Sequence, residues 1–321
     1  MKRLTHDRYE RAAGFMKREV RPLERAMFAY HFEGGEAAVV VRALEGFQNE
    51  DGGFGRGLEP DIRMAESSVV ATKFALQVMM DVGVDEDEKL VRGGVEYLLE
   101  QFDETRRVWP LVGEDVMMAA HAPWWNWDGL EKEFGGYKVN PKAGVARCLK
   151  YYEGLVPVDF VNGIIDDLVD ELGGADEVLP FFDLVSYLML LQMPGFEAAK
   201  NVFVSKQMKD MATKIVDGDP SIWDGFAVKA IWLAPSPHAP LADVLVDELA
   251  INLDYEIDHQ GDDGAWRPSW SWGSTFKDEW EKAEREWTGV LTLAMLRSLR
   301  DFGQIEGVEP VKGNVFKYHI D

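Results

Sequence analysis

A short pattern that occurs near both ends of the chain constrains the fold more than any other feature. It reads Gln, three residues, Gly, one residue and an aromatic side chain. The first copy comprises Gln48, Gly52 and Phe54, and the second comprises Gln260, Gly264 and Trp266. A loop and then a helical segment follow each copy. A motif that recurs together with its following helix indicates a repeat architecture.

The helical segments after the two copies also match in phase. The matched residues are Glu66, Ser68, Thr72, Asp81 and Gly83 in the first segment, and Glu286, Thr288, Thr292, Asp301 and Gly303 in the second. The final glycine of each set is a typical helix stop, because it readily adopts the left-handed conformation. We predict a third, partial copy in Arg92, Gly93, Tyr97, Leu98 and Gln101, whose aromatic residue, Trp109, falls two residues late.

Helical periodicity dominates the rest of the chain, whereas alternating strand patterns are rare. We therefore predict an all-α fold. The expected helical segments are 5–30 with a kink or restart at Pro22, 36–48, 66–82, 88–102, 143–154, 159–172, 180–193, 198–216, 222–233, 241–258 and 279–302. Repeated helix pairs bury their faces by stacking on neighbours. The prediction is a single (α/α)6 toroid or barrel over residues 1–307, with a C-terminal tail over 308–321.

The repeated pattern resembles the QW motif of squalene and oxidosqualene cyclases and the related repeat of protein prenyltransferase β-subunits. In those families the Gln caps a helix end and stacks on the aromatic ring, and the repeats build an α/α toroid. The resemblance implies the same structural role for Gln48 and Gln260. It covers both ends of the chain and extends to the middle only through the helix count.

The chemistry implied by those families does not transfer residue by residue. Class II cyclases use an Asp-x-Asp-Asp motif, and its nearest counterpart here, residues 85–88, follows the helix stop at Gly83 and reads as a solvated loop. Protein prenyltransferases bind zinc through Asp, Cys and His, but Cys148 is the only cysteine and has no nearby ligand partners. We therefore predict no zinc, and no other metal site apart from the conditional magnesium site described below.

The loops that follow the two complete repeats are the first candidate site. Residues 57–66 carry three carboxylates predicted to be catalytic, namely Glu59, Asp61 and Glu66, and a predicted substrate-binding guanidinium, Arg63. Residues 267–279 carry Trp270 and Trp272, which we also assign to substrate binding. Carboxylates near an arginine can form a tuned acid/base pair. They can equally form a salt-bridge network that only fixes the loop.

A second unusual segment follows at residues 121–128, where one histidine precedes three indoles. We assign its side chains to substrate binding: His121, Trp124, Trp125 and Trp127. Indoles can wall a cavity, stabilise a carbocation or stack on a sugar. They can also form a packed lid with no ligand. In a closed ring the first and last repeats are neighbours, so we expect both loops and this segment to converge at one mouth.

We predict no cofactor, with one conditional exception. Asp166, Asp167 and Asp170 have the Asp-Asp-x-x-Asp spacing that holds magnesium diphosphate in class I isoprenoid enzymes, so Mg²⁺ is expected only if they bind a diphosphate. The same run suits a solvated helix face. The six His residues are scattered without metal-ligand spacing.

The net charge of −23 repels phosphate backbones and anionic lipid surfaces, so nucleic acid is not an expected partner. We expect no stable membrane insertion, since no stretch approaches 18 uninterrupted apolar residues. The N-terminal segment is basic but has no apolar run typical of a signal peptide, and a cytoplasmic location is expected.

Three functions fit these features. The first is a divergent terpene-cyclase-like or prenyltransferase-like enzyme, or a binding protein, that holds an isoprenoid or other apolar ligand in an aromatic-lined central cavity. The surplus of aromatic residues, 12% with 11 Trp, favours it. The second is a carbohydrate-active (α/α)6 glycosidase or lyase that uses an Asp/Glu pair. The third is a non-catalytic scaffold. The expected partner is a small apolar or sugar ligand.

Overall fold

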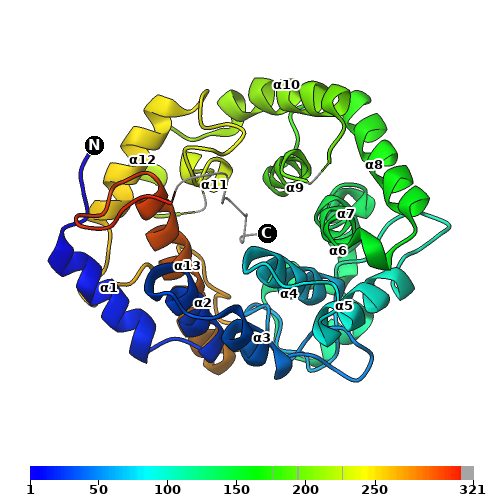
Figure 1. Cartoon of the computed structure of the whole chain (residues 1–321), viewed down its shortest axis with the longest axis horizontal. Helices are drawn as coiled ribbons and strands as arrows, with labels where there is room; N and C mark the ends of the chain where they lie inside the picture. Colours follow the sequence, from blue (N-terminus) through cyan, green and yellow to red (C-terminus); the bar gives the residue numbers. More distant parts are fainter. Residues whose placement is uncertain (176, 194, 226, 312–321) are drawn as a thin grey trace. The chain divides into compact units, whose positions relative to one another are not determined.

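The computed structural model describes residues 1–175, 177–193, 195–225 and 227–311. Over these residues the chain forms thirteen α-helices joined by loops and short 3-10 turns, with isolated bridges and no β-strand (Figure 1). The prediction of an all-α fold is confirmed. The helices are α1 His6–Arg18, α2 Pro22–Glu33, α3 Ala37–Glu45, α4 Val69–Asp81, α5 Lys89–Glu100, α6 Trp127–Glu133, α7 Lys142–Tyr151, α8 Val158–Gly173, α9 Phe181–Leu191, α10 Ala198–Ile215, α11 Ala230–Leu233, α12 Val246–Asp258 and α13 Lys277–Asp301.

Local signals in the sequence set several helix ends. Pro22 opens α2 at a position where its missing N–H costs nothing. The Ser68 hydroxyl caps α4 by accepting a hydrogen bond from the N–H of Ala71 at 3.2 Å. Gly83 and Gly303 follow α4 and α13 with φ values of 70° and 69°, which is the left-handed conformation expected of a helix stop.

The predicted helix over 222–233 is largely wrong. Only Ala230–Leu233 is α-helical, after a 3-10 turn at Pro220–Ile222. Trp223, a large apolar residue of this range, is buried in a loop instead, and its indole N–H donates to the carbonyl of Asp217 at 2.9 Å. The short helix α6 was not predicted.

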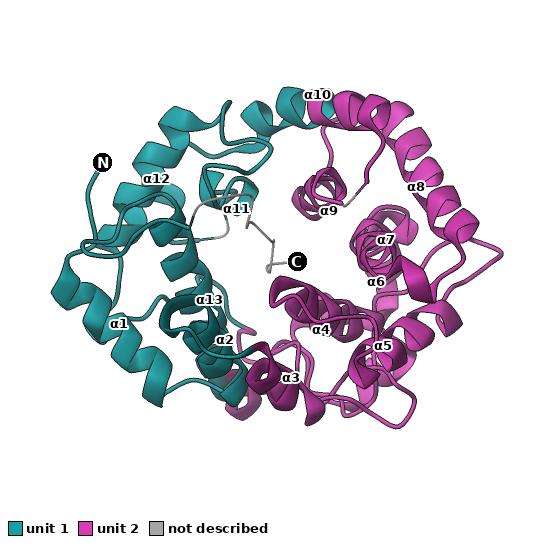
Figure 2. Ribbon diagram, viewed as in Figure 1, with its two compact units in different colours: residues 1–36, 207–271, 281–320 teal, residues 37–206, 272–280, 321 magenta. Residues whose placement is uncertain are grey.

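The described residues group into two compact units (Figure 2). Unit 1 draws on residues within 1–36, 207–271 and 281–320, and unit 2 on residues within 37–206 and 272–280. In unit 2, α7 packs against α4, α8 and α9, while α4 also packs against α5. In unit 1, α1 packs against α2 and α11 against α12. The single domain over 1–307 stays a prediction, and residues 312–321 of the predicted tail lie outside the described residues.

The N-terminal segment of unit 1 pairs with the segment that follows α13. The N–H of Leu4 donates to the carbonyl of Gln304 at 2.7 Å, and the N–H of Glu306 donates to the carbonyl of Leu4 at 3.0 Å. Residues from the two ends of the described chain therefore complete unit 1 together.

The two complete repeats adopt the same turn. The side-chain amide of Gln48 donates a hydrogen bond to the backbone carbonyl of Gly52 at 2.9 Å. The side-chain amide of Gln260 donates in the same way to the backbone carbonyl of Gly264, also at 2.9 Å. Gly52 and Gly264 have φ values of 83° and 93°, a region that favours glycine.

Each repeat turn is also attached to a neighbouring helix in the same way. The Gln48 amide donates a second hydrogen bond to the carbonyl of Leu90, in the first turn of α5, at 3.1 Å. The Gln260 amide donates to the carbonyl of Arg8, in the first turn of α1, at 3.3 Å. In both copies, the Gln therefore ties its turn to the start of another helix of the same unit.

The aromatic residue of each repeat is fixed by the helix that follows it. The N–H of Phe54 donates to the Thr72 hydroxyl at 2.9 Å, and the N–H of Trp266 donates to the Thr292 hydroxyl at 3.0 Å. Both threonines are fully buried. The matched threonines thus perform the same function in α4 and α13.

The partial third copy differs from the complete ones. The side chain of Gln101 is exposed, whereas the side chains of Gln48 and Gln260 bind the first turn of a neighbouring helix. Its aromatic residue, Trp109, is fully buried, and the indole N–H donates to the carbonyl of Leu98 at 2.6 Å.

Candidate functional site

The candidate site lies in unit 2, where a short backbone pairing joins two predicted segments. The N–H of Arg63 donates to the carbonyl of Ala120 at 2.9 Å, and the N–H of Ala122 donates to the carbonyl of Asp61 at 2.9 Å. Ile62 and His121 form the antiparallel bridge between these bonds. The pairing places the carboxylate-bearing loop next to the aromatic segment.

A third segment reaches the same place through Asp61. The Trp272 indole N–H donates to the Asp61 carboxylate oxygen Oδ1 at 2.8 Å. Both residues are almost fully buried, since Asp61 is 3% exposed and Trp272 is 1% exposed. The structure thus brings together two residues that are 211 positions apart and that belong to the two loops following the repeats. Because a buried carboxylate needs hydrogen-bond donors, Trp272 both satisfies and orients Asp61.

Two other charged side chains of the loop, Glu59 and Arg63, hold its shape. A Glu59 carboxylate oxygen accepts a hydrogen bond from the N–H of Asp61 at 3.3 Å. The Arg63 guanidinium lies 3.8 Å from the Glu279 carboxylate and donates to the carbonyl of Pro60 at 3.3 Å. Glu279, like Trp272, lies in the segment 272–280 of unit 2. Asp61 and Arg63 therefore both attach the first loop to this segment.

His121 is buried between backbone and aromatic partners. Its Nδ1 lies 2.7 Å from the carbonyl of Ala119, and its Nε2 lies 3.1 Å from the Asn126 side-chain oxygen. Because a backbone carbonyl can only accept, Nδ1 carries the proton. The Phe276 ring lies 5.8 Å from the imidazole, centroid to centroid.

The three indoles of the aromatic segment have different surroundings. Trp125 is buried and stacks on Phe134 at 5.9 Å, so it belongs to the packing of unit 2. Trp124 is 37% exposed, and Trp127 is half-buried. The N–H of Trp127 lies 3.4 Å from the Met117 sulfur, which attaches the indole segment to residues 114–118.

Two predicted site residues are not brought to Asp61 by any described contact. Glu66 is exposed at the end of its loop. Trp270 belongs to unit 1, where its ring meets Trp287 edge-on at 5.3 Å. Within the candidate site, Trp272 instead has Trp280 as its aromatic neighbour, at 5.8 Å.

Exposed apolar side chains accompany the site, and of these the sequence predicted only Trp124. Four of the exposed large apolar residues come from the segments that meet there: Met117, Met118, Trp124 and Phe276, with exposed fractions of 44%, 89%, 37% and 45%. Phe276 contacts the His121 ring, and Met117 contacts the backbone of Trp127. Two adjacent methionines in a segment without helical periodicity are the signal that could have revealed this surface.

Two of the three carboxylates of the acidic run on α8, those of Asp166 and Asp167, form ion pairs. Asp167 lies 2.7 Å from Arg107 and 3.2 Å from Lys142, and Asp166 pairs with Lys200. Among the described residues, no group of three or more His, Cys, Asp or Glu side chains is arranged to hold a metal ion. Cys148 is buried in α7, with its thiol 3.9 Å from the carbonyl of Lys73. No helix of the described residues is long and apolar enough to span a bilayer.

Comparison with known protein families, with characterised proteins and with solved structures found no significant match to this chain. The site must therefore be interpreted from its own geometry. It combines a buried, oriented carboxylate, a second carboxylate and an arginine that fix its loop, a buried imidazole and a margin of exposed apolar side chains. A carboxyl group in such surroundings can transfer a proton to or from a bound molecule.

Proposed function

We propose that this chain binds an isoprenoid or another long apolar ligand at the Asp61 site, and that Asp61 is the catalytic acid of a terpene-cyclase-like reaction. The observation that carries the proposal is the buried Asp61–Trp272 hydrogen bond among segments with exposed apolar side chains. Apolar residues gathered around a polar centre favour an apolar ligand over a sugar, since removing such surface from water stabilises the complex.

We further propose that the helix pairs close into an (α/α)6 toroid with an aromatic-lined central cavity. The identical attachment of both repeats to the first turn of a neighbouring helix supports this arrangement, because each repeat continues a stack of helix pairs. An experimental structure tests it directly. Helices that form an open stack would contradict the toroid without affecting the ligand proposal.

In the proposed reaction, the Asp61 carboxyl donates its proton to a carbon of an alkene. The proton forms a new C–H bond with the π electrons, the neighbouring carbon becomes a cation, and Asp61 becomes a carboxylate. The indoles of Trp272 and Trp280 provide π faces that favour a cation. Loss of a proton from the cation to a carboxylate, for which Glu59 is the nearest candidate in sequence, restores a neutral product.

Binding is tested by titrating the full chain with geranylgeraniol while tryptophan fluorescence is followed. Replacing both Trp124 and Phe276 by Ser should weaken binding at least tenfold, because burying each ring contributes about 2 kcal/mol. Val39→Ser is the matched control, since Val39 is 46% exposed on α3. Equal weakening by the control, or no binding at all, would contradict the proposal.

Catalysis is tested by incubating the protein with squalene or geranylgeranyl diphosphate and analysing the products by mass spectrometry. Asp61→Asn should reduce turnover by about 10² or more while leaving geranylgeraniol binding intact. Asp247→Asn, at an exposed position of α12, is the control and should remain active. Binding without turnover would identify a carrier and would overturn the catalytic role of Asp61.

The carbohydrate-active alternative rests on one observation, the placement of two carboxylates, Glu59 and Asp61, on one loop beside indoles. It predicts binding of maltohexaose or another oligosaccharide instead of geranylgeraniol, measured in the same titration. Failure of both ligands to bind favours the non-catalytic scaffold.

A further inference from the structure

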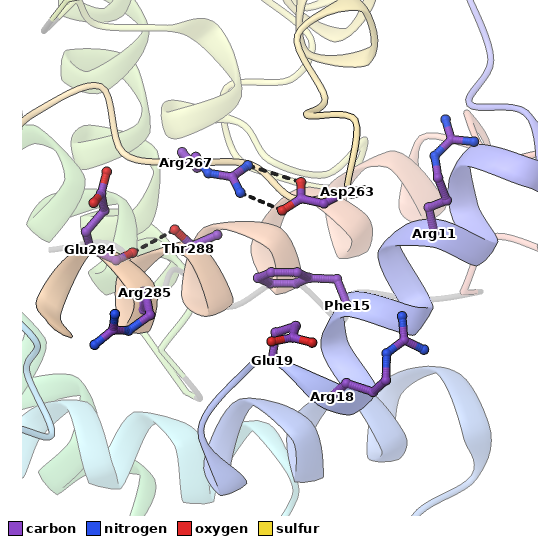
Figure 3. A pocket seen from close by; sticks show the side chains of 9 residues that line it. All are labelled: Arg11, Phe15, Arg18, Glu19, Asp263, Arg267, Glu284, Arg285 and Thr288. Carbon is purple, nitrogen blue, oxygen red and sulfur yellow. Dashed lines mark hydrogen bonds and ion pairs between the residues drawn. The ribbon is translucent and has the colours of Figure 1, made fainter. Parts of the chain in front are cut away.

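Unit 1 contains an open pocket of about 580 Å³ next to the second repeat (Figure 3). The lining side chains come from α1 and the residue after it, from the repeat turn and the residue after it, and from α13. They are Arg11, Phe15, Arg18, Glu19, Asp263, Arg267, Glu284, Arg285 and Thr288. The pocket size suits a small organic molecule.

The charges of this pocket contrast with those of the whole chain. Four guanidiniums meet here although the net charge of the protein is −23. One of them, Arg267, is held by the Asp263 carboxylate through two hydrogen bonds, drawn as dashed lines in Figure 3. The other three form no ion pair with any carboxylate in the described part of the chain: Arg11, Arg18 and Arg285.

The fold does not require these arginines, as the first repeat shows. Alignment of the two repeats on Gln48 and Gln260, and on the helix carbonyls that they bind, gives the equivalent positions of Arg11, Arg18 and Arg267. Alignment of the following helices on Thr72 and Thr292, which bind the repeat aromatics in the same way, gives the position equivalent to Arg285. The counterparts of Arg11, Arg18, Arg267 and Arg285 are Gly93, Glu100, Gly55 and Ala65. The same structural unit thus forms without a single positive charge at these positions.

Two positions of the first repeat are closely surrounded by neighbouring atoms. A β-carbon added to Gly53 would lie 2.6 Å from the Tyr97 ring, and one added to Gly55 would lie 2.0 Å from the carbonyl of Glu66. In the second repeat the connection to the following helix is longer, with residues 267–287 in place of 55–67. The arginines and the longer connection therefore distinguish the second repeat from the first.

The backbone of α1 makes room for one of the arginines. A β-carbon at Gly14 would lie 3.0 Å from Nη2 and 3.2 Å from Nη1 of Arg18. A side chain at residue 14 would therefore make the guanidinium of Arg18 shift by a few tenths of an ångström. Glycine in the middle of a helix is unfavourable. The glycine at residue 14 therefore costs helix stability but leaves space for the guanidinium of Arg18.

We propose that this pocket binds a phosphate ester of a small polyhydroxylated molecule, such as a sugar phosphate. Guanidiniums are well suited to phosphate oxygens, with which they form paired charge-assisted hydrogen bonds. The carboxylates of Glu19 and Glu284 are the acceptors for ligand hydroxyl groups, and the Phe15 ring, at the centre of Figure 3, provides an apolar wall. The four arginines exceed the three acidic residues by one, so the pocket favours an anion.

Calorimetric titration of the full chain with glucose 6-phosphate, glucose and inorganic phosphate tests this proposal. We expect glucose 6-phosphate to bind at least tenfold more tightly than inorganic phosphate, and glucose to show no binding. The affinity should fall as the salt concentration rises. Vesicles containing phosphatidylinositol phosphate replace the soluble ester in a parallel titration, and tighter binding to them assigns the same chemistry to a lipid headgroup.

Arg18→Gln and Arg285→Gln should each weaken binding of glucose 6-phosphate at least tenfold. Arg42→Gln is the control, because Arg42 is an exposed arginine on α3 outside the pocket. Gly14→Ala should displace Arg18 and weaken binding while the melting temperature stays equal or rises, a result that general loss of structure cannot produce. Equal affinity for phosphate and the ester, equal weakening by Arg42→Gln, or no binding of the ester at millimolar concentration would overturn the proposal.

Discussion

The backbone of Gly264 approaches Ala12 so closely that a β-carbon added to Gly264 would lie 2.4 Å from the Ala12 nitrogen. The first repeat contains the same relationship, with 2.6 Å between a β-carbon at Gly52 and the carbonyl oxygen of Gly93. Because these neighbours are backbone atoms, they cannot move aside as a flexible side chain could. The glycine of the repeat is therefore required by helix contact as well as by its positive φ.

Gly264→Ala should consequently lower the free energy of unfolding by about 3–5 kcal/mol, since it combines backbone strain with overpacking. Gly34→Ala separates the two effects. Gly34 has a φ of 73° but nothing within 4 Å of its added β-carbon, so it should lose only about 1 kcal/mol. Urea unfolding of both variants measures the difference, and similar losses would show that the close approach is unimportant.

Gln260→Ala should lower the free energy of unfolding by about 1–2 kcal/mol, because it removes the hydrogen bonds that attach the repeat turn to α1. Gln101→Ala is the control from the partial repeat. Gln101 is exposed, so its truncation should change stability by less than about 0.5 kcal/mol. A neutral Gln260→Ala variant would contradict the structural role of the repeat.

Trp272→Phe should lower the free energy of unfolding by about 1–3 kcal/mol, since it removes a hydrogen-bond donor from the buried Asp61 carboxylate. Trp124→Phe makes the same chemical change at an exposed position and should be nearly neutral. If Trp272→Phe is as stable as the parent in thermal unfolding, the hydrogen bond does not hold the loops together.

Asp183 should make the stability depend on pH. Burial at the start of α9 raises the pKa of its carboxyl group from its usual value near 3.8 to about 6, although the N–H of Asn140 partly offsets the shift. The folded protein thus holds this proton more tightly than the unfolded chain, and the resulting stabilisation is complete below pH 3.8 and lost as the pH rises through 6.

Asp183→Asn should therefore raise the free energy of unfolding at pH 7 by about 2 kcal/mol relative to the parent, because it removes a buried charge. The difference should disappear near pH 4. Urea unfolding between pH 4 and 7 measures it, with Asp247→Asn at an exposed position as the control. A difference that is constant over this range would contradict the linkage.

The turn of each repeat and the helix after it were predictable, because the hydrogen bonds that join them, Phe54 to Thr72 and Trp266 to Thr292, span only 18 and 26 residues. The helix stops at Gly83 and Gly303 follow from local backbone preferences that any sequence reading can use. The helix predicted around Trp223 failed because apolar periodicity cannot distinguish a helix face from a loop whose indole is buried against backbone.

The matched loops predict that Trp272 lies close to Asp61. They do not predict the backbone partners of Asp61 and Arg63. The pairing of Asp61 and Arg63 with residues 120–122 uses backbone groups, which leave no pattern in the side chains. Trp270 was assigned to the same site as Trp272, yet it packs on Trp287 instead. Nothing in the sequence indicates where along this loop the chain passes from one unit to the other.

The pairing of Leu4 with residues 304–306 has a consequence for biosynthesis. Residues 1–36 are translated before residues 37–321, and their partners Gln260 and Gly264 follow more than 200 residues later. At a typical elongation rate the delay is roughly 10–50 s. Over that interval α1 and α2 have no tertiary partners from α13, whereas residues 37–206 emerge as one continuous stretch. Trp272 is translated late as well, so the Asp61 hydrogen bond is among the last contacts that a nascent chain can make.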